Sequence, residues 1–239
     1  MGSNESSWVP AFTCVYETFA KLKLKFKKIQ VSVDGGGATG TSTGGKMISK
    51  KYKLKFLSSG LLYRYASYLL IKYKPKNKIK YLKKEFSKLN QNKLDKINLH
   101  SLEISKESAT IAKINKVRNI LKNFQKKFAK KNKKCCIEGR DISTKILPNS
   151  DVKFYFKCNL DIAAYRRFKE LKKKYNKIKI KDVKKALRIR NNHDLKRKNS
   201  PLRKHIDAIE IDTGKLNKQA MLKKMSKHID ETIKKKYGY

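Results

Sequence analysis

The sequence predicts an α/β fold in which a parallel sheet carries helices on both faces. Three observations support this fold class. The chain has 239 residues, the length of one ordinary domain, and 39% of them are hydrophobic, which is enough to build a core. Short apolar segments typical of strands alternate with longer segments of helical periodicity. A strand that leads into a glycine-rich loop and then a helix, from Val31 to Lys46, is typical of a phosphate-binding turn.

The first predicted strand covers Ile29 to Val33, where apolar and polar residues alternate before Asp34 and Gly35. Six of the eleven glycines lie between residues 35 and 45, so the backbone there is expected to turn tightly and to approach a ligand closely. After the loop, the sequence predicts a helix over 43–51, a short strand and a turn at Gly60 within 54–60, and a helix over 61–73. Helices with an irregular insert are expected over 74–110, then one amphipathic helix over 110–131 and a buried strand over 133–139 with a polar turn at 139–141. The remaining elements are expected as a strand over 151–158, basic helices over 160–175 and 181–198, a short strand over 208–213 and a last helix over 216–236.

Residues 1–27 are predicted to be an N-terminal extension, disordered or non-native, outside a single domain over 28–239. No positive cluster precedes their short apolar run, so they do not read as a signal peptide. No segment reaches the roughly 18 consecutive apolar residues that span a bilayer, so no membrane contact is expected. The four cysteines form no C-x-x-C pair, which argues against a disulfide framework or a zinc site and fits a reducing cytoplasm.

The net charge of +43 admits two interpretations, a nucleic-acid-binding surface or a solvated lysine surface. The basic residues are spread along the whole chain, and all but nine of them are lysine. A nucleic-acid binder would place exposed aromatic residues among its cations. Here Phe154, Tyr155 and Phe156 stand in an apolar strand pattern that indicates core. The rare arginines are more informative, because only arginine offers a planar fork that grips a phosphate or carboxylate with two hydrogen bonds.

The loop at residues 35–43 nearly matches the pattern G-x-x-x-x-G-K-[ST], in which backbone N–H groups and a lysine hold phosphates. Gly35 and Gly40 have the required spacing, but Thr41 occupies the position of the lysine. Thr43 is expected to reach a magnesium ion bound to the phosphates, whereas Lys46 is expected to project from the side of the helix and miss them. The nucleotide-binding residues expected in the loop are Gly35, Gly36, Gly37, Ala38, Thr39, Gly40, Thr41, Ser42 and Thr43.

Several downstream segments carry a more specific pattern. "LSSGLLYR" is similar to D-[ST]-G-x-x-Y-R, "IEGRDISTKILPNSDVKFYF" to G-R-D-x-G-T-x-x-x-P-x-[AS]-x-x-K, and "AAYRRFKEL" to R-R-x-x-x-L. "RIRNNHDLKRKNSPL" is similar to R-x-x-x-D-x-x-R-x-x-[AS]-P-L, and "DAIEIDTGKL" to D-A-x-x-[IL]-D-T-[ST]-x-[LM]. Over residues 29–230 these ordered segments resemble the bacterial cytidylate kinase family of P-loop nucleoside monophosphate kinases. Seven of the nine arginines fall on positions of these motifs: 64, 118, 140, 166, 167, 190 and 197.

The resemblance implies a P-loop kinase-type parallel sheet with a small CMP-binding insert at about 74–115 and a mobile lid at about 164–190. It implies that the acceptor nucleotide is held by residues of four segments, and that arginines of the lid reach the phosphates of ATP. The implied substrate-binding residues are Ser59, Arg64, Arg140 and Arg197 around the acceptor phosphate, Arg118 and Asp141 at the cytosine edge, Arg190 and Asp194 at the ribose, and Tyr63 with no particular contact assigned. The implied catalytic residues are Arg166, Arg167 and Thr43.

The resemblance therefore implies an enzyme that transfers a phosphoryl group from ATP to CMP or dCMP, with Mg²⁺, and yields ADP with CDP or dCDP. Such a protein would be a cytoplasmic monomer of pyrimidine nucleotide metabolism, with no membrane or specific nucleic-acid partner. Two alternatives are a nucleotide-binding pseudoenzyme that lacks the loop lysine and a basic nucleic-acid-binding protein. Three consequences of the missing lysine are considered. The lid arginines and the backbone could compensate for it, Lys46 or another lysine could move to the phosphates, or turnover could be slow or absent.

Overall fold

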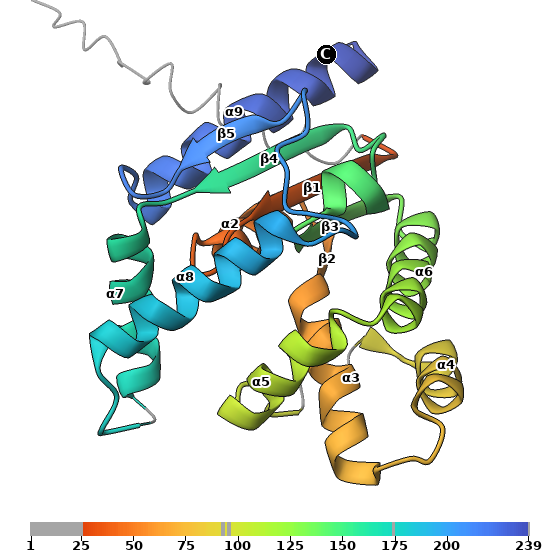
Figure 1. Ribbon diagram of the computed structural model, residues 1–239. Coiled ribbons are helices and arrows are strands. Elements are labelled where there is room, and N and C mark those ends of the chain that lie inside the picture. Colours follow the sequence, from red (N-terminus) through yellow and green to blue (C-terminus); the bar gives the residue numbers. More distant parts are fainter. Residues whose placement is uncertain (1–25, 92–93, 95–96, 174, 239) are drawn as a thin grey trace, which may run out of the picture.

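The computed structural model describes residues 26–91, 94, 97–173 and 175–238. Its centre is a five-stranded sheet with the order β2-β3-β1-β4-β5, in which every neighbouring pair is parallel (Figure 1). The strands are β1 (Ile29–Gly35), β2 (Lys55–Ser58), β3 (Lys134–Gly139), β4 (Val152–Lys157) and β5 (Ile209–Asp212). This arrangement confirms the predicted fold class, and all five strands lie where the sequence predicts them.

Helices connect the strands and cover both faces of the sheet (Figure 1). The helical elements are α2 (Thr41–Lys51), α3 (Ser59–Tyr73), α4 (Lys78–Lys88), α5 (Leu102–Ile111), α6 (Asn115–Lys131), the π-helical turn η2 (Ile142–Ile146), α7 (Leu160–Lys172), α8 (Ile180–Lys196) and α9 (Lys218–Tyr237). Helix connections between parallel strands bring all carboxyl ends of the strands to one edge, which is where ligands bind in this class of sheet.

The sheet separates two hydrophobic cores, and β3 shows the division. Cys135 and Ile137 point into a core shared with α3, α4 and α6, whereas Cys136, between them, points into a core with α2 and α9. Both faces of the strand are therefore buried, which is why its sequence reads as a continuous apolar run. Phe154 and Phe156 of β4 are buried in the second core, as their apolar pattern predicts.

The α7–α8 hairpin stands apart from these two cores. Its helices pack on each other through a small cluster that includes Ala163, Ala164, Val183 and Leu187. In Figure 1 the hairpin lies on the left of the view, whereas α3 and α5 lie lower and further to the right. Ala38 of the glycine loop and Cys158 pack against this cluster, so the hairpin is joined to the loop and to the chain that follows β4.

Three predictions about local structure were wrong. The chain does not turn at Gly60, because Ser58 caps α3 directly and its Oγ accepts a hydrogen bond from Leu61 N. Residues 110–131 do not form one helix, because α5 ends at Ile111 and α6 begins at Asn115. Ile111 and Val117 are both buried in the same core, yet on one straight helix they would point about 120° apart. Helix α2 begins at Thr41 rather than at residue 43.

Most of the predicted extension, residues 1–25, lies outside the described residues. Phe26, which the sequence assigned to that extension, is buried in the core beneath the sheet. Among the described residues no three His, Cys, Asp or Glu side chains gather as a metal site, and Cys135, Cys136 and Cys158 are free thiols. None of the described helices combines the length and the apolar character that crossing a bilayer requires.

Candidate active site

The glycine loop follows β1 at the carboxyl edge of the sheet and leads into α2. Gly40 adopts a φ of 92° and Ala38 a φ of 59°, so the loop bends twice through the left-handed region before the helix begins. A β-carbon on Gly35 would lie 2.7 Å from the carbonyl oxygen of Phe156, so only glycine fits there. The bent loop and the helix N-terminus present backbone N–H groups to one space, the arrangement that holds anions.

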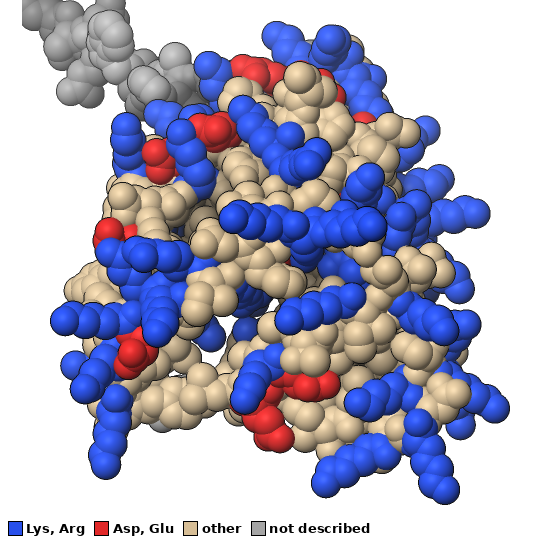
Figure 2. All heavy atoms as spheres, viewed as in Figure 1, with Lys and Arg blue, Asp and Glu red and all other residues tan. Residues whose placement is uncertain are grey.

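That space is a cavity of about 800 Å³ between the glycine loop, the start of α3 and the α7–α8 hairpin. Figure 2 shows the molecular surface hollowed between the hairpin and the α3–α5 side, with lysine and arginine side chains around the opening. Lysine and arginine side chains are also scattered over the rest of this face, so the charge does not form one stripe. The predicted site residues on the cavity wall are Gly36, Gly37, Ala38, Gly40, Thr41, Ser42, Thr43, Arg64, Arg140, Arg166, Arg167 and Arg190.

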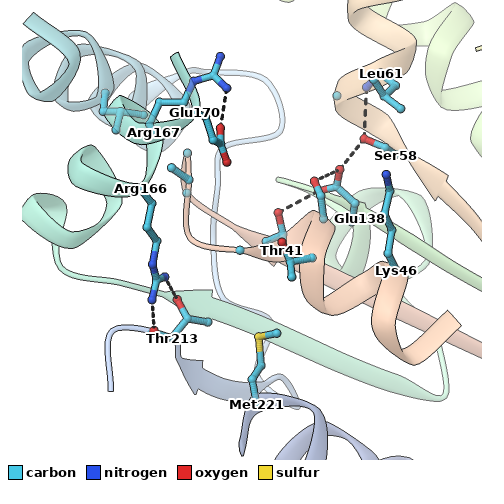
Figure 3. Close-up of a pocket in the computed structure, with 18 of the residues that line it drawn as sticks. Thr41, Lys46, Ser58, Leu61, Glu138, Arg166, Arg167, Glu170, Thr213 and Met221 are labelled. Atoms are coloured by element: carbon cyan, nitrogen blue, oxygen red, sulfur yellow. Dashed lines mark hydrogen bonds and ion pairs between the residues drawn. The ribbon is translucent and has the colours of Figure 1, made fainter. Parts of the chain in front are cut away.

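A buried carboxylate lies directly under the loop, at the end of β3. Glu138 is 4% exposed and accepts hydrogen bonds from the hydroxyls of Thr41 (2.9 Å), Ser42 (2.9 Å) and Ser58 (Figure 3). The threonine that replaces the expected lysine thus satisfies Glu138 with a hydroxyl instead of an ammonium group. No ion pair joins Glu138 to a cation among the described residues. The centre of the loop therefore carries an anion with no cation at its side.

Four arginines surround the opposite part of the cavity, and they repel one another. Although its side chain is accessible from the cavity, desolvation by the surrounding protein lowers the pKa of Arg190 to about 10, and the cations Arg140, Arg64 and Arg167 lower it further. Burial, and then Arg167, also lowers the pKa of Arg64. Like charges crowded together in a concave site indicate that an anion belongs between them. Since Arg64 comes from α3, Arg140 from the end of β3 and Arg190 from α8, the fold itself builds this cluster.

A second cavity of about 710 Å³ adjoins this cluster and has a different charge pattern. Arg118 of α6 and Asp141 line it and form a buried ion pair of 2.9 Å, with Tyr63 beneath the guanidinium group. Asp194 bonds Arg197 (3.2 Å) and Arg140 (3.0 Å), and through them the pairs extend back to the first cavity. Arg118, Arg140 and Arg197 thus each have a carboxylate partner.

Asp34 joins the glycine loop to the segment that carries Arg140 and Asp141. Its buried carboxylate accepts hydrogen bonds from Ile142 N (2.8 Å), Ser143 N (2.7 Å) and Ser143 Oγ (2.6 Å). Burial raises the pKa of Asp34 to about 6, although these hydrogen bonds oppose the rise. The residue before the loop therefore fixes where the two cavities lie relative to each other.

The two lid arginines have protein partners in this conformation. Arg166 donates to Thr213 O (2.7 Å) and Oγ1 (3.2 Å), and Arg167 pairs with Glu170 (2.8 Å) on the surface (Figure 3). Thr213 in turn donates to Thr39 O (2.7 Å), which ties β5 to the glycine loop. Both arginines line the same cavity as the glycine loop.

Sequence reasoning missed several residues that shape the site. Ser58 lines the cavity, whereas Ser59, its predicted neighbour in this role, is buried against Gly139. Glu138 could have been found, because it ends a strand that lies beside the strand of the loop, at the edge where ligands bind. Asn191, whose side chain accepts from Gly37 N at 2.9 Å, carries no such signal. Five predicted residues line neither cavity: Gly35, Thr39, Ser59, Asp194 and Arg197.

Lys46 was expected to project from the side of α2 and to miss the phosphates. In the structure it lines the same cavity as Thr41 and Ser42. Lys46 lies four residues after Ser42, about one helical turn, so the two side chains share a face of α2.

The fold is that of a P-loop kinase, because it combines a glycine loop, a parallel sheet and a cluster of arginines. A crystal structure of an uncharacterized protein from Eubacterium ventriosum ATCC 27560 shares the fold with a TM-score of 0.52 at 15% identity, over 86% of this chain and 99% of that one.

The family model for cytidylate kinase matches residues 31–231. A cytidylate kinase of Clostridium tetani is 33% identical over 88% of this chain and 98% of its own length. One from Bartonella tribocorum is 33% identical over 87% of this chain and 97% of its own. The chain belongs to the cytidylate kinase family.

Proposed function

We propose that this protein transfers a phosphoryl group from ATP to CMP or dCMP, producing ADP and CDP or dCDP. Family membership supports a nucleoside monophosphate kinase. The observation that carries the proposal is the pair of adjoining cavities. One combines an amide cradle with a cluster of arginines, and the other has a buried Arg118–Asp141 pair suited to a neutral ring.

The acceptor nucleotide would bridge the two cavities. Its phosphate would lie among Arg64, Arg140 and Arg190, whose mutual repulsion an added dianion relieves. The base would lie toward Arg118 and Asp141, because a carboxylate accepts from the exocyclic amine of cytosine and a guanidinium group donates to ring acceptors. Arg197 and Asp194 stand between the two places and would contact the acceptor phosphate and its sugar.

The donor would lie with its phosphates on the backbone of residues 36–43. Phosphoryl transfer depends on positioning and charge neutralisation, and a phosphate acceptor needs no catalytic base. Arg166 and Arg167 would leave Thr213 and Glu170 to reach the transferring group, so the hairpin would act as the lid. We assign the lid to about 164–190 and the nucleotide-binding insert to about 74–115.

The side-chain oxygens beside the glycine loop would suit a magnesium ion that arrives with the nucleotide. Mg²⁺ is usually held by one or two carboxylates, hydroxyls and substrate phosphates. Ser42 and Glu138 supply a hydroxyl and a carboxylate 2.9 Å apart, and Thr43 supplies a second hydroxyl on the cavity wall. When bound, the ion would neutralise charge that develops on the phosphate oxygens.

A coupled assay of ADP release tests the proposal, with CMP, dCMP, UMP and AMP as acceptors. We expect turnover with CMP or dCMP that exceeds turnover with UMP and AMP by at least tenfold. Nucleotide binding without ADP release from any acceptor would identify a pseudoenzyme and refute the proposal. Binding to single-stranded nucleic acid in place of nucleotides would identify the second alternative. We further propose a cytoplasmic monomer of pyrimidine nucleotide metabolism, to be checked by its mass in solution.

A further inference from the structure

We infer that Lys46 takes over the role of the absent loop lysine and contacts the phosphates of the donor nucleotide. This inference rests on the proposed function and deepens it, because it names the cation that neutralises the donor phosphates. It starts from the chemistry of the loop, where Thr41 replaces the cation that the G-x-x-x-x-G-K-[ST] pattern supplies.

The first argument is the charge balance at the loop. Glu138 is a buried carboxylate whose partners are three hydroxyls, so the loop centre has an anion where the donor phosphates add more negative charge. Two anionic groups in one water-poor site repel strongly unless a cation lies between them. The site therefore needs a positive side chain within reach of both Glu138 and the cradle of amides.

The second argument is the position of Lys46. Figure 3 shows its side chain extending from α2 toward Ser58 and Glu138, with the ammonium group at the cavity. Its backbone lies about one turn after Ser42, so a flexible four-carbon side chain covers the distance back to the start of the helix. Side chains in a helix also lean toward its N-terminus, which directs Lys46 toward the loop.

The third argument is that Lys46 is available. It makes no hydrogen bond, ion pair or ring contact with any residue in the described part of the chain. Of the other lysines on the cavity wall, Lys169 lies over the ring of Tyr165 at 4.6 Å, and Lys218 begins α9 next to the apolar Met221. Lys46 alone among these three shares a helix with the loop.

A four-variant cycle tests the inference: the natural protein, Lys46→Gln, Thr41→Lys and the double variant. We expect Lys46→Gln to lower kcat about 10- to 100-fold, in the range seen when one charge-stabilising group is lost, with the KM for CMP changed less than threefold. In the Thr41→Lys background the same change should alter kcat less than twofold, because the loop then has its own cation. Lys46→Arg should keep more activity than Lys46→Gln, since it keeps the charge.

Lys50→Gln is the matched control, because Lys50 is exposed on the same helix and does not line the cavity. Lysine and glutamine have similar helix propensities, so both variants should melt like the natural protein. A kcat for Lys46→Gln within twofold of the natural value would overturn the inference and leave the proposed kinase activity intact.

Calorimetric titration with ADP and ATP separates this inference from the kinase proposal. We expect Lys46→Gln to weaken ATP binding at least fivefold more than Lys50→Gln does, whether or not CMP is phosphorylated. Weakened binding in a protein that turns over no acceptor would support the role of Lys46 and refute the kinase activity. Equal ATP affinity in both variants would refute a phosphate contact by Lys46.

Discussion

The two cavities of this protein use arginine in opposite ways. At the cavity lined by Tyr63, Arg118 forms a buried ion pair with Asp141, and Arg197 pairs with Asp194 close by. In the cavity under the glycine loop, Arg64 and Arg190 lie near other cations, and their pKa values are lowered by burial and by that crowding. The difference indicates that the paired end receives a neutral ring and the crowded end receives a dianion.

Removing a cation from the crowded cavity should have the largest effect. We expect Arg190→Met to lower kcat/KM for CMP about 10³-fold, because the phosphate loses a desolvated charge partner. The free energy of unfolding should stay equal or rise slightly, since a mutual repulsion disappears. Steady-state kinetics and urea unfolding measure the two effects. Arg188→Met, two residues earlier on α8 and away from the cavity wall, should change neither, and equal kinetic losses in both variants would contradict the comparison.

Breaking a pair at the balanced end should instead cost stability. We expect Asp141→Asn to lower the free energy of unfolding by about 3 kcal/mol, because it leaves the buried Arg118 charge without its carboxylate. Preference for CMP over UMP should fall as well. Urea unfolding and the two-substrate assay test this. A variant as stable as the natural protein that keeps its preference would show that the two cavities do not differ as described.

The contribution of Asp34, which links the glycine loop to the segment of Arg140 and Asp141, to the free energy of unfolding should depend on pH. The pKa of Asp34 is raised from 3.8 to about 6, so the folded state holds a proton that the unfolded state releases. Stability from this group is present below pH 4 and is lost as pH rises toward 7, about 2 kcal/mol between pH 4.5 and 7. The difference in unfolding free energy between the natural protein and Asp34→Asn should shrink by that amount over this range. A difference independent of pH would show that Asp34 is ionised throughout.

The smallest effect belongs to the exposed pair on the hairpin. Arg167 and Glu170 are three residues apart, and the side chain of Glu170 is 64% exposed. Glu170→Gln should change the unfolding free energy by less than about 0.5 kcal/mol, because solvent screens such pairs. It frees Arg167 for the donor phosphates, so kcat should rise, by at most about twofold. A stability loss as large as that of Asp141→Asn would remove the distinction between surface and buried pairs.

The sheet and the arginine positions could be predicted from the sequence because both rest on local pattern. Strands β1, β3 and β4 are buried on both faces, so their apolar runs read clearly. The arginines stand out against a background of lysine, and the structure brings Arg64, Arg140 and Arg190 to one cavity from segments far apart in sequence.

What could not be predicted depends on contacts between distant segments. Glu138 meets Thr41 only because β3 pairs with β1 so that Val33 lies beside Glu138, a register that no short window contains. The break between α5 and α6 has no glycine or proline to mark it, and it follows from burying Ile111 and Val117 in one core. The place of Lys46 on the cavity wall depends on the segments that face α2, and spacing along the helix does not contain them.

Helix α8 runs from the glycine loop to the paired arginines with a single stripe of side chains. Leu187 touches the glycine loop at Gly37, Asn191 accepts from the same residue, and Asp194 holds the paired arginines. These residues are spaced by four and three along the helix, so α8 sets a distance of about 10 Å between the glycine loop and the paired arginines. Inserting one residue after Asn191 would rotate Asp194 by about 100° and remove its contacts with the paired arginines. The length of this segment is therefore constrained even where its exposed residues are free to vary.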